Sequence, residues 1–246
     1  MRNYQEEFEK RVAFIKETVA NAHASGIVYG NSGGKDCSLV SILCKAACEN
    51  TVGIIMPCSS KRNFGQDTVD ALEVANKYGI ETRTVDLTPI KELAAETFGK
   101  VAELSPMASA NINPRLRMIT LYTIGQSENR LVAGTGNRSE AAMGYFTKWG
   151  DGAYDFNPIS DLTVKEIFEF LEFLGAPRCV IDKAPSAALF EGQTDEQEMG
   201  VTYASIDSWL LTGKALSEED ETIITRRFNN SAHKRRMPLT FLDYQG

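Results

Sequence analysis

The chain has 246 residues, of which 43% are apolar, so it is long enough to bury one substantial core but short for two full α/β domains. Twenty-six Lys and Arg residues against 33 Asp and Glu residues give a formal net charge of −7, which disfavours binding of nucleic acid through phosphate neutralisation. Because no apolar run approaches the roughly 20 residues of a membrane span and the N-terminus lacks a signal-peptide core, we expect one cytoplasmic domain over residues 1–246, with neither a membrane nor nucleic acid as partner.

The order of apolar segments predicts an α/β fold. Residues 4–24 form an amphipathic helix, because apolar side chains recur there at spacings of three and four: Phe8, Val12, Ile15 and Val19. Strand-length apolar runs then alternate with helix-length segments. The expected strands are 26–29, 52–56, 82–85 and 131–133, and the expected helices between them are 38–47, 67–78, 89–101 and 114–126. This alternation is typical of βαβ units and predicts a Rossmann-like, doubly wound parallel sheet with helices on both faces.

The C-terminal half adds two expected helices and one expected loop. The helices are 164–174 and 218–229, and residues 184–201 are small, polar and acidic without a clear period, as in loops that cover active sites. The five cysteines include no C-x-x-C pair, so we expect reduced, structural thiols. Cys44 and Cys48, four residues apart, are a weaker alternative as a metal pair.

A glycine-rich segment follows the first expected strand and precedes a helix. It reads Gly30, Asn31, Ser32, Gly33, Gly34, Lys35, Asp36, Cys37. The backbone N–H groups of such a turn and the positive end of the next helix favour a phosphate. The segment is neither the mononucleotide P-loop, since Tyr29 stands six residues before Lys35 where glycine is required, nor the dinucleotide fingerprint G-x-G-x-x-G. A tight turn without a ligand is the alternative.

This loop resembles the S-G-G-x-D-S motif of the ATP pyrophosphatase superfamily, which cleaves ATP between the α and β phosphates and transfers AMP. Cys37 stands where that motif has serine, so a neighbouring hydroxyl or water would have to replace it. Further segments resemble the motifs of NAD synthetases in family order, over nearly the whole chain: 111–118 (NINPRLRM), 134–140 (GTGNRSE), 144–152 (GYFTKWGDG), 155–158 (DFNP), 183–187 (KAPSA) and 233–236 (HKRR).

The resemblance implies a role for each block. ATP would contact the glycine loop together with Thr135 and Ser186, and Mg²⁺ would be held by Asp36 and Glu140. Glu140 also fits the N3 position of a helix-capping pattern that begins at Asn137, and the two roles are compatible.

The resemblance also implies a group that binds the pyridine nucleotide substrate: Arg115, Lys148, Asp155, His233 and Lys234. Without the resemblance, these residues would be interpreted as solvated charges. Arg117 lies roughly 200° around the helix from Arg115, so it is expected to pair or to face solvent.

The expected reaction is that of a ligase. It adenylates the carboxylate of nicotinic acid adenine dinucleotide with ATP and amidates it with ammonia, giving NAD, AMP and pyrophosphate. Lys35 and the loop amides would stabilise pyrophosphate, and Asp151 is a hypothetical base for ammonia. A glutaminase domain does not fit within this length, and the resemblance implies a homodimer. The alternatives are another adenylating enzyme of the superfamily, such as an RNA thiolase or an amidotransferase synthetase subunit, or a non-catalytic adenine-nucleotide sensor.

Two further departures from the family pattern concern ATP. Many relatives have lysine where this chain has Val164, and Lys165 follows one place later, a shift of about 100° around a helix. Ala188 replaces an aspartate of the expected lid. ATP handling is therefore expected to differ in detail from that of the relatives.

Overall fold

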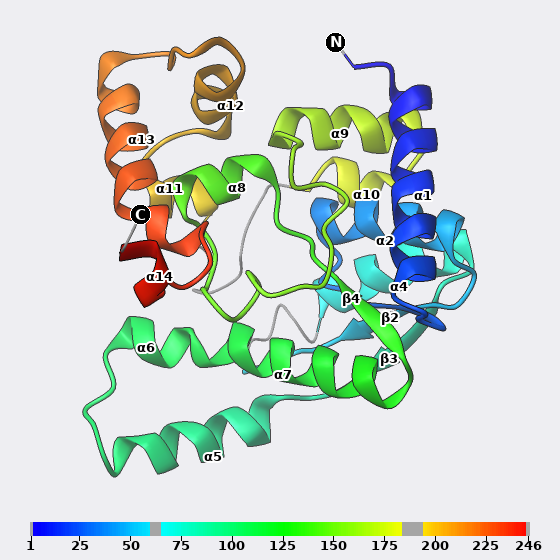
Figure 1. The fold of residues 1–246 in the computed structure, drawn as a ribbon, viewed down its shortest axis with the longest axis horizontal. Helices are drawn as coiled ribbons and strands as arrows, with labels where there is room; N and C mark the ends of the chain where they lie inside the picture. The colour runs from blue at the N-terminus through cyan, green and yellow to red at the C-terminus, as the bar shows by residue number, and fades with distance from the viewer. Residues whose placement is uncertain (1, 60–64, 184–193, 245–246) are drawn as a thin grey trace.

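Four parallel strands form the centre of the molecule. The computed structural model describes residues 2–59, 65–183 and 194–244 (Figure 1). The sheet has the order β3-β2-β1-β4, with β1 at Gly26–Gly30, β2 at Thr51–Ile55, β3 at Glu81–Thr84 and β4 at Arg130–Ala133. All three pairings are parallel, which confirms the predicted sheet, and each strand begins and ends within one residue of its predicted bounds.

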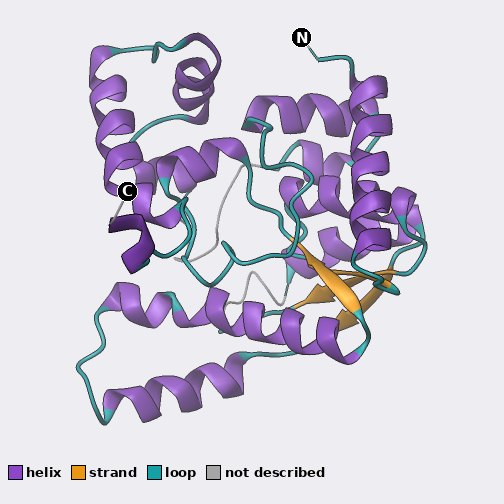
Figure 2. Ribbon diagram, in the orientation of Figure 1, coloured by secondary structure: helices purple, strands orange, loops and turns teal. Residues whose placement is uncertain are grey.

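Helices cover both faces of this sheet (Figure 2). One face carries α1 (Tyr4–Asn21), α2 (Lys35–Ala47), α4 (Gln66–Tyr78), α9 (Val164–Phe173) and α10 (Arg178–Ile181), and the other carries α5 (Thr88–Gly99), α6 (Pro106–Ala110) and α7 (Ile112–Ser127).

Side chains of β1 alternate between the two cores. Ile27 and Tyr29 join the cluster under α2 and α9, whereas Val28 packs with Val132 toward α7. Because successive strand residues face opposite sides, the run of apolar residues in β1 supports two layers of helices. The doubly wound fold predicted from the sequence is confirmed.

A third, smaller apolar cluster lies away from the sheet (Figure 1). It is built by α8 (Arg138–Met143), α9, α11 (Asp195–Met199), α12 (Tyr203–Thr212) and α13 (Glu218–Asn230). The chain ends with η1 (Ala232–Lys234) and α14 (Phe241–Tyr244). This cluster brings Tyr203 of α12 beside the glycine loop.

The predicted loop 184–201 is wrong in its second half. Residues 184–193 lie outside the described part of the chain, but α11 occupies Asp195–Met199. Its polar residues cap the helix: Thr194 and Gln197 form a capping box, and Asp195 is buried. Capping and buried hydrogen bonds thus explain a composition that resembles a loop in the sequence.

The five cysteines are free thiols, as predicted, and Cys37, Cys44 and Cys58 are buried. Within the described residues, no helix combines the length and apolar character that crossing a membrane requires. Among the described residues, no three His, Cys, Asp or Glu side chains form a group that could hold a metal ion.

Candidate active site

A cavity of about 560 Å³ opens at the carboxyl ends of β1, β2 and β4, a volume ordinary for small-molecule sites. The strand order changes direction at β1, which lies between β2 and β4. Ligands of open α/β sheets bind at such switch points. The lining includes the glycine loop, the turn after β4 with Thr135, the inner face of α7 and residues of the segment 144–151.

The glycine loop is held against α4. Gly33 has a φ of +70°, and a Cβ there would lie 2.3 Å from the carbonyl oxygen of Asp67, so only glycine fits. The buried Asn31 accepts a hydrogen bond from the Gly33 N–H at 3.3 Å and donates to the Ala71 carbonyl at 3.3 Å. The helix α2 then begins at Lys35 and directs its N-terminus at the cavity.

Lys35 and Asp36 form an ion pair at the start of α2. The Nζ of Lys35 lies 2.7 Å from Oδ2 of Asp36, and Asn137 donates its amide to Oδ1 of Asp36 at 3.0 Å. Burial by itself lowers the pKa of Lys35, but the charges of Asp36 and Glu140 outweigh it and raise that pKa. Lys35 is therefore a cation at neutral pH although only 6% of its surface is exposed.

Cys37 lies beneath the loop as a neutral thiol. Its Sγ lies 3.2 Å from Oγ of Ser32, and burial raises the pKa of the thiol. The hydroxyl of the neighbouring Ser38 donates to the Gly34 carbonyl at 2.8 Å.

Glu140 has a structural role that the sequence predicts. Asn137 and Glu140 form a capping box: the Glu140 N–H donates to the Asn137 side chain at 2.9 Å, and the Asn137 N–H donates to Oε2 of Glu140 at 3.0 Å. Burial and the nearby charge of Asp36 raise the pKa of Glu140 to about 8. Two neighbouring carboxylates that repel each other are a donor set that fits a divalent cation supported by phosphate oxygens.

This raised pKa predicts a loss of stability with rising pH in the metal-free protein. A carboxyl group whose pKa is raised on folding stabilises the fold while it is protonated, so its contribution falls as pH rises from about 4.5 to about 8. Tm measured by calorimetry without metal is expected to fall over this range and to recover on addition of Mg²⁺. In the Glu140→Gln variant, which has no proton to lose in this range, Tm should depend less on pH. An unchanged dependence of Tm on pH contradicts the prediction.

The other end of the cavity is formed by Asp151 and Lys234. Nζ of Lys234 donates to the carbonyls of Gly144 and Phe146, each at 2.8 Å, and burial lowers its pKa. Oδ1 of Asp151 accepts the Thr147 N–H at 2.9 Å. Asp151 opens onto the cavity, yet many protein atoms surround its carboxyl group, and this burial raises its pKa against the opposing effects of Thr147 and nearby cations.

The two arginines of α7 point apart, but the cavity lies on the face of Arg117. Arg117 lines the cavity and donates from Nε to the Met56 carbonyl at 3.3 Å, while burial lowers its pKa. Arg117 thus faces the cavity and not the outer surface of the molecule. Arg115 is exposed, lies outside the described lining, and donates to the Lys148 carbonyl at 3.3 Å. The helical angle between the two positions holds, but the sequence does not say which face turns inward.

The remaining predicted substrate residues lie around the outside of this end. Nζ of Lys148 donates to the His233 carbonyl at 3.0 Å and lies 5.5 Å from the centre of the Trp149 ring. His233 is exposed. Asp155 accepts the Val132 N–H at 2.8 Å and the Tyr122 hydroxyl at 3.3 Å, which ties it to the end of β4. Ser186 lies outside the described residues.

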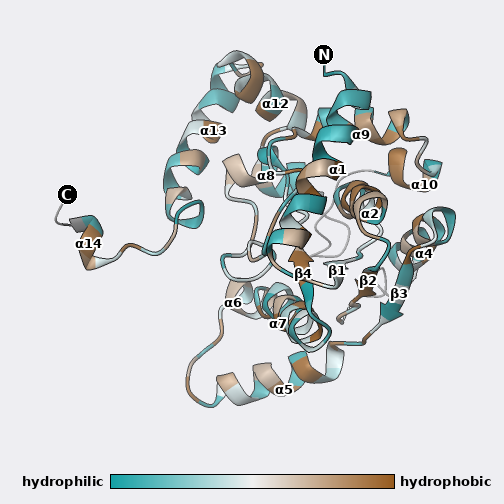
Figure 3. Cartoon of the chain, turned by 45° about the vertical axis from the view of Figure 1, so that its right-hand side comes forward, coloured by the Kyte–Doolittle hydropathy of each residue, from teal (hydrophilic) through white to brown (hydrophobic). Residues whose placement is uncertain are grey.

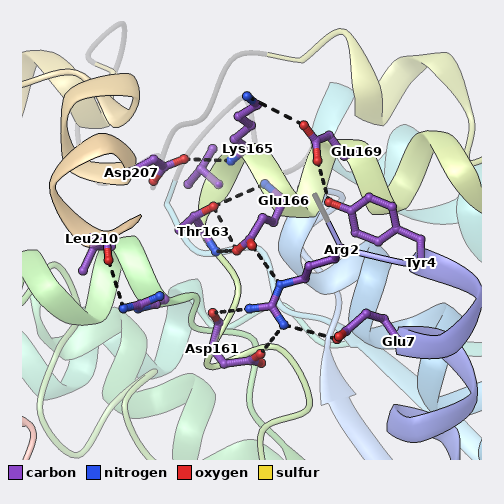
Figure 4. A network of polar contacts seen from close by, with 12 residues as sticks. Arg2, Tyr4, Glu7, Asp161, Thr163, Lys165, Glu166, Glu169, Asp207 and Leu210 are labelled. Carbon is purple, nitrogen blue, oxygen red and sulfur yellow. Dashed lines mark hydrogen bonds and ion pairs between the residues drawn. The ribbon is translucent and has the colours of Figure 1, made fainter. Parts of the chain in front are cut away.

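Lys165 does not take the place of the missing lysine at position 164. Its side chain is 72% exposed and lies 3.9 Å from Glu169 on the same helix (Figure 4). Only its backbone N–H faces inward, where it donates to Asp207 at 2.9 Å. Val164 is buried in the apolar cluster of α8 and α12.

Several polar side chains of the cavity were not predicted from the sequence. Lys183 pairs with Asp67 and Asp70 of α4 at 2.8 and 2.6 Å. The segment after α8 contributes Tyr145, and α11 and α13 contribute Asp195, Glu198 and Arg227. Tyr203 of α12 reaches the glycine loop through Lys35, whose Nζ lies 5.6 Å from the centre of its ring. Tyr145 and Lys183 lie within the motif segments 144–152 and 183–187, but no role was predicted for either. No local motif marks the others, because the packing of distant helices brings them to the glycine loop.

A glycine loop at a helix N-terminus, buried cations and paired carboxylates at a topological switch point define a nucleotide-binding α/β protein. The family model described as NAD synthase matches residues 7–238, and the chain belongs to this family. An NH(3)-dependent NAD(+) synthetase from Carboxydothermus hydrogenoformans is 46% identical over 96% of this chain and 97% of its own length.

Solved structures of synthetases superimpose on this chain as well. An NMN synthetase from Francisella tularensis superimposes with a TM-score of 0.92 at 38% identity, covering 98% of this chain and 99% of that one. An NH3-dependent NAD synthetase from Campylobacter jejuni superimposes with a TM-score of 0.79 at 30% identity, again covering 98% and 99%. The fold is thus shared with these synthetases over nearly the whole of each chain.

Proposed function

We propose that this chain is an ammonia-dependent NAD synthetase, a ligase that uses ATP to convert nicotinic acid adenine dinucleotide into NAD. The observation that carries the proposal is one cavity with a phosphate-binding end at Lys35 and Asp36 and a second polar end at Asp151 and Lys234. ATP and an acceptor carboxylate can meet between these ends. The comparisons favour neither another adenylating enzyme of the superfamily nor a nucleotide sensor.

The chemistry needs positioning and charge stabilisation and no enzyme nucleophile. An oxygen of the acceptor carboxylate attacks the α-phosphorus of ATP, and the bond to pyrophosphate breaks. Lys35 and the N–H groups of the glycine loop neutralise the leaving pyrophosphate. Ammonia then attacks the acyl carbon, AMP leaves, and one proton must be removed from the new amide nitrogen. Thr135 would contact ATP from the turn after β4.

Mg²⁺ fits the phosphate-binding end. We propose that Asp36 and Glu140 hold it there, with ATP oxygens and water as the remaining ligands. When bound, the ion would offset negative charge on the phosphates. The raised pKa of Glu140 supports this assignment, because a cation removes the repulsion that keeps the proton on the carboxyl group.

The NMN synthetase superposition favours a second candidate acceptor. Its TM-score of 0.92 exceeds the 0.79 of the NAD synthetase from Campylobacter jejuni. In addition, two residues expected to bind the dinucleotide, Arg115 and His233, are exposed outside the described cavity lining. The mononucleotide acceptor, nicotinic acid mononucleotide, would have the same carboxylate without the second nucleotide.

One experiment decides between the two acceptors. Purified protein receives ATP, Mg²⁺ and ammonium with either the dinucleotide or the mononucleotide, and mass spectrometry follows the amide product and AMP. The proposal expects a higher kcat/KM for the dinucleotide. The opposite preference makes the chain an NMN synthetase. If AMP forms with neither the dinucleotide nor the mononucleotide, both assignments are overturned.

Asp151 is proposed as the base that accepts a proton from the attacking ammonia. Asparagine at this position can still accept the Thr147 N–H but cannot take a proton, so Asp151→Asn is expected to lower the rate of amide formation at least about 100-fold. Adenylation should continue, so quenched reactions should accumulate the acyl-adenylate with pyrophosphate. Normal amide formation would exclude Asp151 as the base.

We propose a homodimer formed through the outer surface of α5 to α7. No residue of α5 is buried, and Figure 3 colours parts of this helix brown, for hydrophobic residues. The exposed apolar side chains of this region are Ile90, Leu93, Phe98, Val101, Met107 and Ile119. An exposed apolar surface of this kind marks an interface. Light scattering after size-exclusion chromatography should give twice the chain mass, and Leu93→Glu with Ile119→Glu should give the monomer. A monomeric wild-type protein at micromolar concentration contradicts this assembly.

A further inference from the structure

The ammonium group of Lys35 lies between a carboxylate and an aromatic ring. Its Nζ is 2.7 Å from Oδ2 of Asp36 and 5.6 Å from the centre of the Tyr203 ring. A cation within about 6 Å of a ring is attracted by the negative charge of the ring face. Both side chains are buried, with 6% of Lys35 and 4% of Tyr203 exposed, so little water weakens this attraction.

The Tyr203 ring is fixed at several points. Its hydroxyl donates to Oδ2 of Asp195 at 3.0 Å, and its backbone N–H donates to Glu196 at 2.8 Å. Tyr145, whose hydroxyl donates to Glu198 at 2.6 Å, lies 3.3 Å from the other oxygen of Asp195. Burial and surrounding carboxylates raise the pKa of Tyr203, so it remains a neutral donor.

A ring suits this place better than a second carboxylate would. It attracts the ammonium group without accepting strong hydrogen bonds, so the Lys35 protons stay available for phosphate oxygens. It also restricts a side chain that has four rotatable bonds. Among the described residues, the ion pair that Lys35 has to exchange when ATP arrives is the one with Asp36.

We propose that Tyr203 is a positioning residue for Lys35: its ring, packed in the apolar cluster of α8, α9 and α11 to α13, keeps the ammonium group at the phosphate-binding end of the cavity. The inference rests on the proposed function, because Lys35 is taken to act on the leaving pyrophosphate. It adds a residue from α12, outside every motif of the glycine loop.

The kinetic test removes the ring and then the lysine. Tyr203→Leu is expected to lower kcat about tenfold with the KM of the acceptor unchanged, whereas Tyr203→Phe keeps the ring and should stay within about threefold of the wild type. In a Lys35→Gln background, Tyr203→Leu should cause no further loss, because it acts only through Lys35. A tenfold loss in that background as well overturns the proposal.

A spectroscopic test needs no turnover. In protein labelled with ¹³C-lysine, the ε-methylene protons of Lys35 should be shifted upfield by the ring current of Tyr203, and Lys35→Gln assigns the signal by its disappearance. The shift should persist in Tyr203→Phe and vanish in Tyr203→Leu. An unshifted signal in the wild type overturns the positioning even if Tyr203→Leu does not fold. Failure of NAD formation with the shift present would instead count against the proposed function.

Discussion

The Asp36→Asn variant is expected to form NAD about 1,000-fold more slowly than the wild type. The substitution keeps the shape of the side chain and removes its charge. Lys35 then loses its ion-pair partner, Asn137 loses a charged acceptor, and the proposed Mg²⁺ site loses one of its two carboxylates. Because the same residue orders three groups around the phosphates, the effect should appear in kcat for NAD and AMP alike. Mass-spectrometric initial rates at saturating ATP measure it.

Lys165→Gln is the matched control for this variant. It also changes one charge near the start of a helix, but the side chain is 72% exposed and lies outside the described lining of the cavity. We expect wild-type rates from it. If Asp36→Asn also keeps wild-type rates while its melting curve is unchanged, the assignment of the phosphate-binding end is wrong.

Gly144→Ala is expected to lower the free energy of unfolding by about 2–4 kcal/mol, the largest stability effect of a single methyl group that we predict. Gly144 has a φ of +62°, and a Cβ there would lie 2.1 Å from Cβ of Ser231. The left-handed backbone alone costs roughly 1 kcal/mol for alanine, and the contact with Ser231 adds the rest. The clash also separates α8 from the segment that holds Lys234, whose Nζ binds the Gly144 carbonyl.

Gly213→Ala isolates the backbone term. Gly213 has a similar φ of +79° at the end of α12, but no atom of the described residues lies within 4 Å of the place that an added methyl group would take. Urea unfolding of both variants should therefore give a loss of about 1 kcal/mol for Gly213→Ala and a clearly larger one for Gly144→Ala. Equal losses would mean that the packing of Ser231 against Gly144 contributes nothing.

Local rules account for most of the fold. The parallel sheet follows from apolar runs of strand length between helices, and the four strands lie within one residue of their predicted bounds. The helices α11 and α12 were not predicted, because neither shows a clean apolar stripe. Their buried positions include polar groups that only tertiary partners satisfy, such as Asp207, which accepts from Ser139 at 2.5 Å.

The sequence by itself determined the proposed phosphate-binding end: the glycine loop, Lys35, Asp36 and the capping residue Glu140 lie within short motifs, whose geometry is set by neighbouring residues. Tertiary structure decided the rest of the cavity. It turned Arg117 inward instead of Arg115, sent Lys165 to solvent, and brought Tyr203 to Lys35. The physical reason is that a motif fixes backbone conformation over a few residues, whereas the direction in which a helix presents its side chains depends on which of its faces packs against distant parts of the chain.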